Sequence, residues 1–152
     1  MRITLAAVGR DKSGPTRDLY QHYVKRLSWS FTLREVEERK PLPATALKLR
    51  ESNLLRDALP KGATLVTLDE RGKNLSSQEF AQMIGHWRDN GVQDLAFVIG
   101  GADGLHESLR DTATRSISFG RMTWPHMMVR ALLAEQLYRA QSILAGHPYH
   151  RE

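Results

Sequence analysis

The glycine-rich segment Gly100–Gly104 directly follows a short apolar run, Leu95–Ile99. Its three glycines allow the backbone to turn sharply and to approach a ligand closely, and a helix that follows offers unpaired N–H groups. The segment does not match Gly-x-Gly-x-x-Gly, because Ala102 stands at the second glycine position, and no Gly-Lys-Ser/Thr sequence follows. A dinucleotide or ATP site is therefore weakly supported, and a tight turn without a ligand is the common alternative.

The segment from Phe119 to His126 is unusually apolar for a loop. It holds Met122 and Trp124 between a short apolar run, Ser116–Phe119, and a long helical pattern. Such a loop either covers the core, with Trp124 as a plug over the helix start, or contacts a flat apolar ligand such as an adenine ring. Both interpretations are open on this segment alone.

The last seven residues, Gly146–Glu152, contain two histidines, a tyrosine and an arginine. Terminal residues are usually solvated unless contacts hold them, and this tail is rich in groups that make such contacts. His147 and His150 have a spacing found in metal sites, but Pro148 prevents the helical geometry that would aim both rings at one ion. No carboxylate cluster nearby supplies a third ligand, so we expect no metal.

Several chemistries are excluded by residue types that the chain lacks. It has no cysteine, hence no disulfide, no thiolate zinc site and no cysteine nucleophile, which favours a cytoplasmic setting. It also has no Gly-x-Ser-x-Gly motif that would present a nucleophilic serine. The apolar run near the N-terminus, Ile3–Val8, is shorter than a signal or membrane segment, so we expect neither export nor a membrane.

The positive charge of the chain is concentrated in its first third. The net charge is +5, and residues 1–61 carry thirteen Lys and Arg against seven Asp and Glu. Arg17, Lys25 and Arg26 lie off the apolar stripe of the helix expected over Pro15–Trp29, and they form a basic face. This asymmetry favours a nucleic-acid surface over a merely solvated one.

Strand and helix patterns alternate along the chain. The expected strands are Ile3–Val8, Phe31–Val36 at an edge, Leu65–Leu68, Leu95–Ile99 and Ser116–Phe119. The expected helices are Pro15–Trp29 with Leu19, Tyr23 and Leu27 buried, Thr45–Leu59, one opened by a capping box at Ser76 and Glu79, and Val129–Leu144, with a polar loop over Asp69–Asn74.

The alternation predicts one α/β domain over residues 1–152, with a mostly parallel sheet of about five strands flanked by helices and joined by right-handed crossovers. Ligands of such sheets bind beyond the carboxyl ends of the strands. We therefore expect the site at the loops after Leu68, Ile99 and Phe119.

The ordered set of motifs resembles one family. The set comprises Val66–Asp69, Gly72-Lys73, Ile99–Leu105, Met122–His126, Arg130, Glu135–Ala140 and His147–His150. Together these segments resemble the ribosomal RNA large-subunit methyltransferase H family, of the knotted α/β (SPOUT) superfamily. Each motif alone is unspecific, but the ordered set spans essentially the whole chain.

The resemblance implies an S-adenosylmethionine-dependent enzyme that methylates N3 of a pseudouridine in helix 69 of 23S ribosomal RNA on assembled ribosomes. It further implies a homodimer and a C-terminal trefoil knot. The methyl donor would contact Leu68, Gly100, Phe119, Gly120, Arg121, Met122, Thr123 and Trp124. The part of the active site that faces the RNA base would be formed by His150, Tyr149, Arg151 and Arg139, with the proton acceptor unassigned. Arg17, Lys25 and Arg26 would bind RNA phosphate.

Elementary chemistry agrees with this implied reaction. A sulfonium methyl group is already activated, so its transfer needs positioning and the removal of one proton, with no metal or covalent intermediate. Methylation at C5 of a pyrimidine ordinarily requires a cysteine adduct, so the lack of cysteine favours a nitrogen or oxygen acceptor. The alternatives are a non-catalytic ribosome-binding or assembly protein with the same fold, and a metal-dependent nucleic-acid hydrolase using His147, His150 and Asp69.

Overall fold

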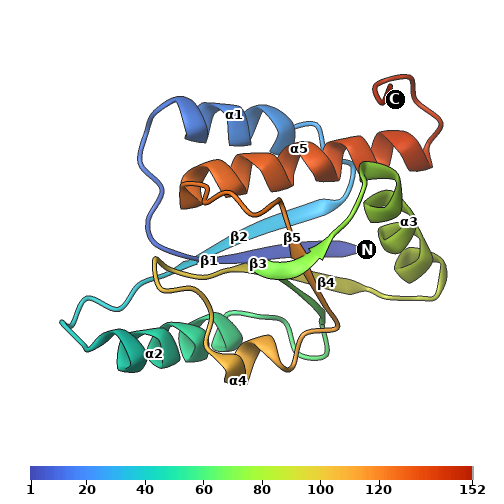
Figure 1. Ribbon diagram of the computed structural model, residues 1–152. Coiled ribbons are helices and arrows are strands. Elements are labelled where there is room, and N and C mark those ends of the chain that lie inside the picture. The colour runs from blue at the N-terminus through green and yellow to red at the C-terminus, as the bar shows by residue number, and fades with distance from the viewer. Residues whose placement is uncertain (152) are drawn as a thin grey trace.

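The computed structural model describes residues 1–151 and builds the chain around one five-stranded sheet (Figure 1). The strands are β1 (Arg2–Val8), β2 (Ser30–Val36), β3 (Thr64–Asn74), β4 (Asp94–Ile99) and β5 (Arg115–Ser118). They lie in the order β2-β1-β4-β3-β5, and all four neighbouring pairs are parallel. The expected parallel α/β sheet and the edge position of β2 are thus confirmed.

Helices cover both faces of the sheet. They are α1 (Pro15–Val24), α2 (Ala44–Asp57), α3 (Ser77–Asp89), α4 (Glu107–Arg110) and α5 (His126–Leu144). Helices α1, α3 and α5 pack together on one face, while α2 and the short α4 lie on the other (Figure 1). Within residues 1–151, none of these helices combines the length and apolar character needed to cross a bilayer.

The central strand β4 shows why the sheet is buried on both faces. Its residues Leu95, Phe97 and Ile99 belong to the core beneath α5, whereas Ala96 and Val98 belong to the core beneath α2. Successive side chains of a strand point to opposite faces, so an unbroken apolar run fits a strand covered on both sides.

The first helix differs from its expected form. Helix α1 ends at Val24 instead of Trp29, and Tyr20 is its buried residue, at 6% exposure. Leu19 is 47% exposed, so the prediction that it belongs to the buried stripe is wrong. Leu27 and Tyr23 do pack against the core, because the buried face passes through Tyr20 instead of Leu19.

The expected polar loop after Leu68 is also wrong, because β3 continues to Asn74. The register of β3 against β5 shifts there, so that Ile117 pairs with both Leu68 and Lys73. A Cβ atom on Gly72 would lie only 2.6 Å from the carbonyl carbon of Ile117. Glycine at this position therefore allows β3 to pass closely over β5.

The starts of α3 and α5 follow from their sequences. Ser76 accepts a hydrogen bond from the Glu79 N–H at 3.1 Å, and Glu79 accepts one from the Ser76 N–H at 2.7 Å, which confirms the expected capping box. Helix α5 begins at His126 instead of Val129. Pro125 stands at its N-cap, where the fixed φ of proline suits the entry into a helix.

A buried arginine ties the start of α5 to the sheet. Arg130 is 1% exposed and donates hydrogen bonds to Glu35 at the end of β2, at 2.6 Å, and to the Gly9 carbonyl after β1, at 3.1 Å. These bonds fix α5 beside the carboxyl edge of the sheet. The strand order and pairing do not reveal whether the chain is knotted, so the trefoil knot implied by the resemblance stays a prediction.

Candidate functional site

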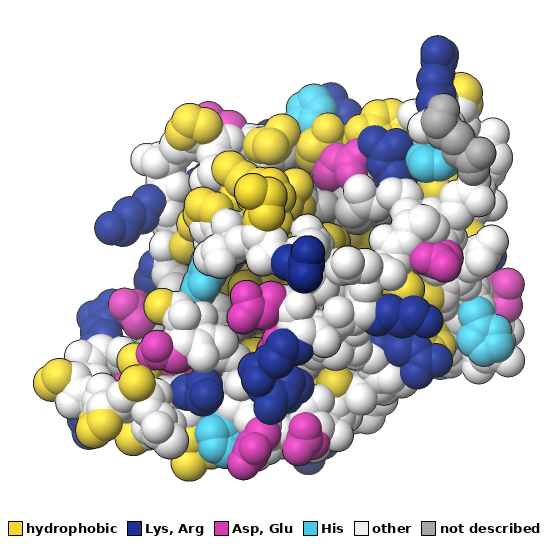
Figure 2. Space-filling model, viewed as in Figure 1, with side chains coloured by type: hydrophobic (Ala, Val, Ile, Leu, Met, Phe, Trp, Pro, Cys, Tyr) yellow, Lys and Arg dark blue, Asp and Glu magenta, His cyan; other side chains and the backbone are white. Residues whose placement is uncertain are grey.

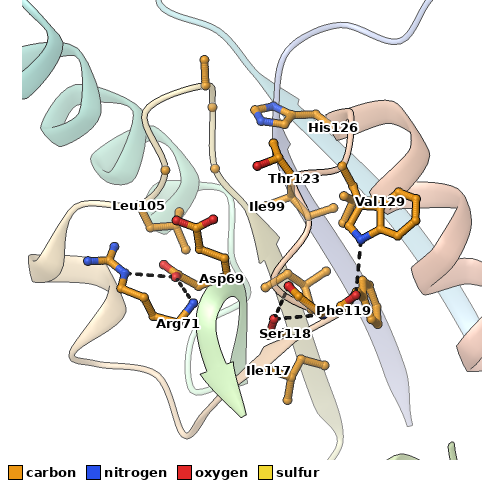
Figure 3. Close-up of a pocket in the computed structure, with 18 of the residues that line it drawn as sticks. Asp69, Arg71, Ile99, Leu105, Ile117, Ser118, Phe119, Thr123, His126 and Val129 are labelled. Carbon is orange, nitrogen blue, oxygen red and sulfur yellow. Dashed lines mark hydrogen bonds and ion pairs between the residues drawn. The ribbon is translucent and has the colours of Figure 1, made fainter. Parts of the chain in front are cut away.

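One pocket lies at the carboxyl edge of the sheet (Figure 3). The cavity has a volume of about 360 Å³ and is lined by residues 68–71 in the middle of β3, by the ends of β4 and β5 with the loops that follow them, and by the first turn of α5. These are the three segments that the sheet topology selected from the sequence, although the first of them is strand and not loop. The predicted location of the site therefore agrees with the pocket.

The loop after β4 is built around glycines that leave no room for side chains. A Cβ atom on Gly100 would lie 2.8 Å from the Gly104 carbonyl carbon, and one on Gly101 would lie 2.8 Å from the Glu51 carboxylate. Gly104 has a φ of 81° and donates its N–H to the Gly101 carbonyl at 3.0 Å. The loop thus forms a compact backbone wall with peptide groups close to any bound ligand.

The loop after β5 forms an opposite, apolar wall. Ser118 Oγ accepts the Gly120 N–H at 3.1 Å and donates to the Gly120 carbonyl at 2.9 Å, which tightens the turn. Trp124 Nε1 donates to the Phe119 carbonyl at 3.3 Å. Trp124 is 37% exposed and Met122 is 76% exposed. The interpretation of Trp124 as a plug in the core is therefore not supported, and both side chains are available to a flat apolar ligand.

The middle of β3 contributes charge to the pocket. Asp69 Oδ1 accepts hydrogen bonds from the Arg71 N–H at 2.9 Å and from Arg71 Nε at 3.3 Å, as Figure 3 shows. Glu70 and Asp103 also line the pocket. On the face seen in Figure 2, acidic side chains lie below a hydrophobic patch left of the centre of the molecule. Arg71 is the basic residue among the lining side chains, and Asp69 already neutralises it. The pocket is therefore predominantly acidic and suits a ligand that carries positive charge.

Two further lining residues come from α5 and were not among the residues proposed from the sequence. His126 and Val129 line the pocket next to Thr123 (Figure 3). Burial, and then the positive charge of Arg130, lowers the pKa of His126, so its ring is neutral at pH 7. Their position just after Pro125, where the third loop joins its helix, is the signal that could have identified them.

The predicted donor-binding residues lie at this pocket with one exception. Leu68, Gly100, Phe119, Gly120, Met122, Thr123 and Trp124 all line it. Arg121 is exposed and is not one of the lining residues. A contact of the donor with Arg121 therefore stays a prediction.

The predicted site residues of the C-terminal tail lie away from this pocket. Helix α5 has 19 residues, so its two ends are about 28 Å apart, and the C-terminus lies past the end opposite the pocket (Figure 1). The single chain therefore does not bring Tyr149 or His150 to the pocket. Arg151 is exposed, and Glu152 lies outside the described residues.

The tail is held against α5 and α1 by a polar network. Arg139 donates to Glu135 at 2.5 Å and contacts His150 Nδ1 at 3.1 Å, and its guanidinium lies 4.8 Å from the centre of the Tyr149 ring. The Tyr149 hydroxyl contacts Glu135 at 3.2 Å and Tyr23 at 3.4 Å. Burial, reinforced by the hydrogen bond to Tyr23, raises the pKa of Tyr149, so its hydroxyl stays protonated.

No group that could hold a metal ion, of three or more His, Cys, Asp or Glu side chains, is found in residues 1–151. Asp69 lies in the pocket and is bonded to Arg71, whereas His150 lies against Arg139 at the far end of α5. The three residues of the hydrolase alternative are therefore not brought together.

The proposed RNA-binding residues are exposed at the two ends of α1. Arg17 lies 3.7 Å from Asp11, and Arg26 donates a hydrogen bond to the His22 carbonyl. Lys25 is exposed at the C-cap of the helix. All three side chains are accessible, although Asp11 partly neutralises Arg17.

Comparison with known proteins gives one consistent result. A family model described as "Predicted SPOUT methyltransferase" matches residues 1–150. Ribosomal RNA large subunit methyltransferase H of Rhodospirillum centenum is 59% identical over 151 residues, and that of Paramagnetospirillum magneticum is 57% identical over 151 residues; both alignments cover 99% of each chain.

Among solved structures, a probable methylase family protein from Haemophilus influenzae Rd KW20 matches with a TM-score of 0.59 and 10% sequence identity. The match covers 99% of this chain and 70% of that one. At this identity the likeness concerns the fold alone.

Proposed function

Because the chain belongs to the SPOUT methyltransferase family, we propose that it transfers a methyl group from S-adenosylmethionine to RNA of the large ribosomal subunit. The observation that carries the proposal is the convergence of residues 68–71 of β3 and the loops after β4 and β5 on one acidic pocket. The relatives named above support the choice of ribosomal RNA as the substrate. A ribosomal substrate implies a cytoplasmic enzyme.

The residues of the pocket fit this cofactor. Trp124 and Met122 offer apolar surface for an adenine ring, and Gly100 and Gly101 bring peptide groups close without side chains. The acidic side chains suit a cation. When bound, S-adenosylmethionine supplies a methyl group that is already activated on its sulfonium sulfur. The protein therefore has to position and orient the methyl donor and the acceptor, and it needs no nucleophile of its own.

At finer detail, the acceptor in our proposal is N3 of a pseudouridine in helix 69 of 23S ribosomal RNA, on assembled ribosomes. The chain has no cysteine to form the adduct that methylation at a pyrimidine carbon ordinarily requires, which supports a nitrogen acceptor. An imide N–H is weakly acidic, so cationic side chains beside it would stabilise the anion and favour loss of the proton.

We further propose that the enzyme acts as a homodimer in which the tail of one protomer serves the pocket of its partner. The support is geometric, because each tail lies about 28 Å of helix away from its own pocket. Arg139, Tyr149, His150 and Arg151 would then form the part of the active site that faces the RNA base. The protonated Tyr149 hydroxyl can donate a hydrogen bond, and the exposed Arg151 can supply positive charge to an N3 anion, whereas Arg139 must first separate from Glu135.

The exposed basic residues of α1 would hold RNA in this proposal. Lys25 and Arg26 make no ion pair within residues 1–151, so their charge is available to phosphate, whereas Arg17 must first separate from Asp11. Phosphate contacts of this kind strengthen binding without reading the sequence.

Transfer of tritiated methyl groups from S-adenosylmethionine tests the proposal. Ribosomes from a strain that lacks the modification should incorporate label in the presence of the protein and not in its absence. Ribosome binding without incorporation above the no-enzyme control would instead support the non-catalytic ribosome-binding protein. Unchanged incorporation in excess EDTA would exclude a requirement for a metal ion.

A further inference from the structure

Glu51 on α2 is a buried carboxyl group, one oxygen of which has no hydrogen-bond partner within residues 1–151. The residue is 7% exposed, and within the described residues its Oε1 atom has no hydrogen-bond partner. A buried carboxylate is costly unless it is paired or neutralised, and cations are its usual partners. Burial, and then the negative charge of Asp103, raises the pKa of Glu51. Helix α2 therefore holds a carboxyl group whose ionised form lacks a counter-charge.

This carboxyl group lies directly behind the glycine loop of the pocket. A Cβ atom on Gly101 would be 2.8 Å from each Glu51 carboxylate oxygen. The neighbouring Ser52 Oγ accepts the His106 N–H at 2.9 Å, so α2 also holds the end of the same loop. Gly101 lines the pocket and Glu51 does not. The backbone of Gly101 thus separates the carboxyl group from the ligand space.

No cationic side chain within residues 1–151 forms an ion pair with Glu51. Asp103, on the glycine loop, is the charged residue that acts on Glu51. The elements packed on α2 carry charged side chains that do not pair with Glu51; these are Arg2 on β1, Arg34 and Glu35 on β2, and Glu107 and Arg110 on α4. The guanidinium of Arg71, which lines the pocket, is bonded to Asp69. A cationic ligand in the pocket would therefore supply a positive charge that Glu51 lacks.

We propose that Glu51 is a specificity-determining residue that favours the positively charged methyl donor over its product, acting through the backbone of Gly101. The inference rests on the proposed function, in which the donor carries a sulfonium cation and S-adenosylhomocysteine carries a neutral sulfur. Glu51 raises the affinity of the pocket for the donor and does not raise its affinity for the product in the same way.

The proposal requires a proton to leave when the donor binds. In the free protein the raised pKa keeps Glu51 protonated to a higher pH than an exposed glutamate. A bound cation stabilises the carboxylate and lowers that pKa, so a proton passes to solvent at pH values between the two. The neutral product sulfur does not produce this shift.

Calorimetric titration of S-adenosylmethionine and S-adenosylhomocysteine tests both consequences. Proton release is measured over a series of pH values from about 4.5 upward, in buffers of different ionisation enthalpy, and affinity is measured at a pH above the range of release. The wild type should release a fraction of a proton with the donor and none through the product sulfur. Glu51→Gln should lose that release and bind the donor about three- to tenfold more weakly, the scale of one charge in partly solvated protein, with product affinity within about twofold.

The matched control is Glu107→Gln, the same chemical change at an exposed residue outside the pocket lining. It should behave as the wild type in both titrations. Asp103→Asn is a second variant for the case in which Glu51→Gln does not fold, as judged by circular dichroism. Because Asp103 raises the pKa of Glu51, this variant should move proton release to lower pH.

These results distinguish a Glu51 that discriminates the donor from the product from a Glu51 that only stabilises the glycine loop. Equal losses of donor and product affinity in Glu51→Gln, or an unchanged pH of proton release in Asp103→Asn, would overturn the proposal. A wild-type protein that binds neither ligand would refute the proposed function itself. A wild type that binds both ligands, with Glu51→Gln indistinguishable from it, would refute this inference alone.

Discussion

The substitution Gly100→Ala should damage the pocket with limited effect on the fold. The new Cβ atom would lie 2.8 Å from the Gly104 carbonyl carbon, 2.9 Å from the Gly104 oxygen and 3.0 Å from Leu105 Cδ2, whereas ordinary contacts begin at 3.4 Å. Two of these neighbours are backbone atoms, so the loop must move by about 0.6 Å, the difference between the first contact and an ordinary one.

That movement sets the size of the expected effects. A misplacement of about 1 Å in a preorganised site costs about 100-fold, so a loss of S-adenosylhomocysteine affinity on the order of tenfold is expected. Overpacking of this kind lowers the free energy of unfolding by about 1–3 kcal/mol. For a chain of 152 residues this lowers the melting temperature by roughly 2–12 °C.

The assay is isothermal titration with S-adenosylhomocysteine, accompanied by thermal unfolding. The matched control is Gly85→Ala on α3, whose Cβ atom would lie 2.7 Å from Leu144 Cδ2, the end of a flexible side chain. It should bind the ligand as the wild type does. Wild-type affinity in Gly100→Ala, or an equal loss of affinity in the control, would refute the assignment of the ligand site to the pocket formed by the glycine loop and its two neighbouring segments.

Three further outcomes follow from the structure. Arg130→Met should lower the free energy of unfolding by about 2–4 kcal/mol, because it breaks a buried, hydrogen-bonded ion pair; an unchanged melting temperature would contradict that role. Ser76→Ala should lower the free energy of unfolding by about 1 kcal/mol in chemical denaturation, because it removes the N-terminal cap of α3; an unchanged free energy of unfolding would contradict the capping role. Replacing Arg17, Lys25 and Arg26 together by serine should weaken ribosome binding and flatten its salt dependence, measured by filter binding, without changing the affinity for S-adenosylhomocysteine; a salt slope equal to that of the wild type would remove these residues from the RNA surface.

The main elements of the fold were predictable because their signals are local. The apolar runs of β1 and β4 identify buried strands, and the capping box at Ser76 marks a helix start. The extension of β3 to Asn74 was not predictable in the same way. Its polar residues pair with β5, which lies more than forty positions later in the chain, and only Gly72 hints at the close approach.

Some residues of the site were predictable from the sequence, and others depend on contacts that are distant along the chain. The parallel sheet predicts which loops meet, so the pocket residues Leu68, Gly100 and Trp124 follow from topology. The tail does not, because the length of α5 carries Tyr149 away from the pocket of its own chain. Glu51 gave no signal either, since a glutamate in an amphipathic helix is normally exposed and its burial depends on the distant glycine loop.

The central claim is tested most directly by mass spectrometry of ribosomal RNA after the reaction. Unmodified ribosomes, the purified protein and S-adenosylmethionine are incubated, and the nucleosides of the helix 69 fragment are analysed. The account predicts one new methyl group, at N3 of a pseudouridine. A methyl group on a carbon atom or in another part of the RNA, or no methyl group at all, would contradict it.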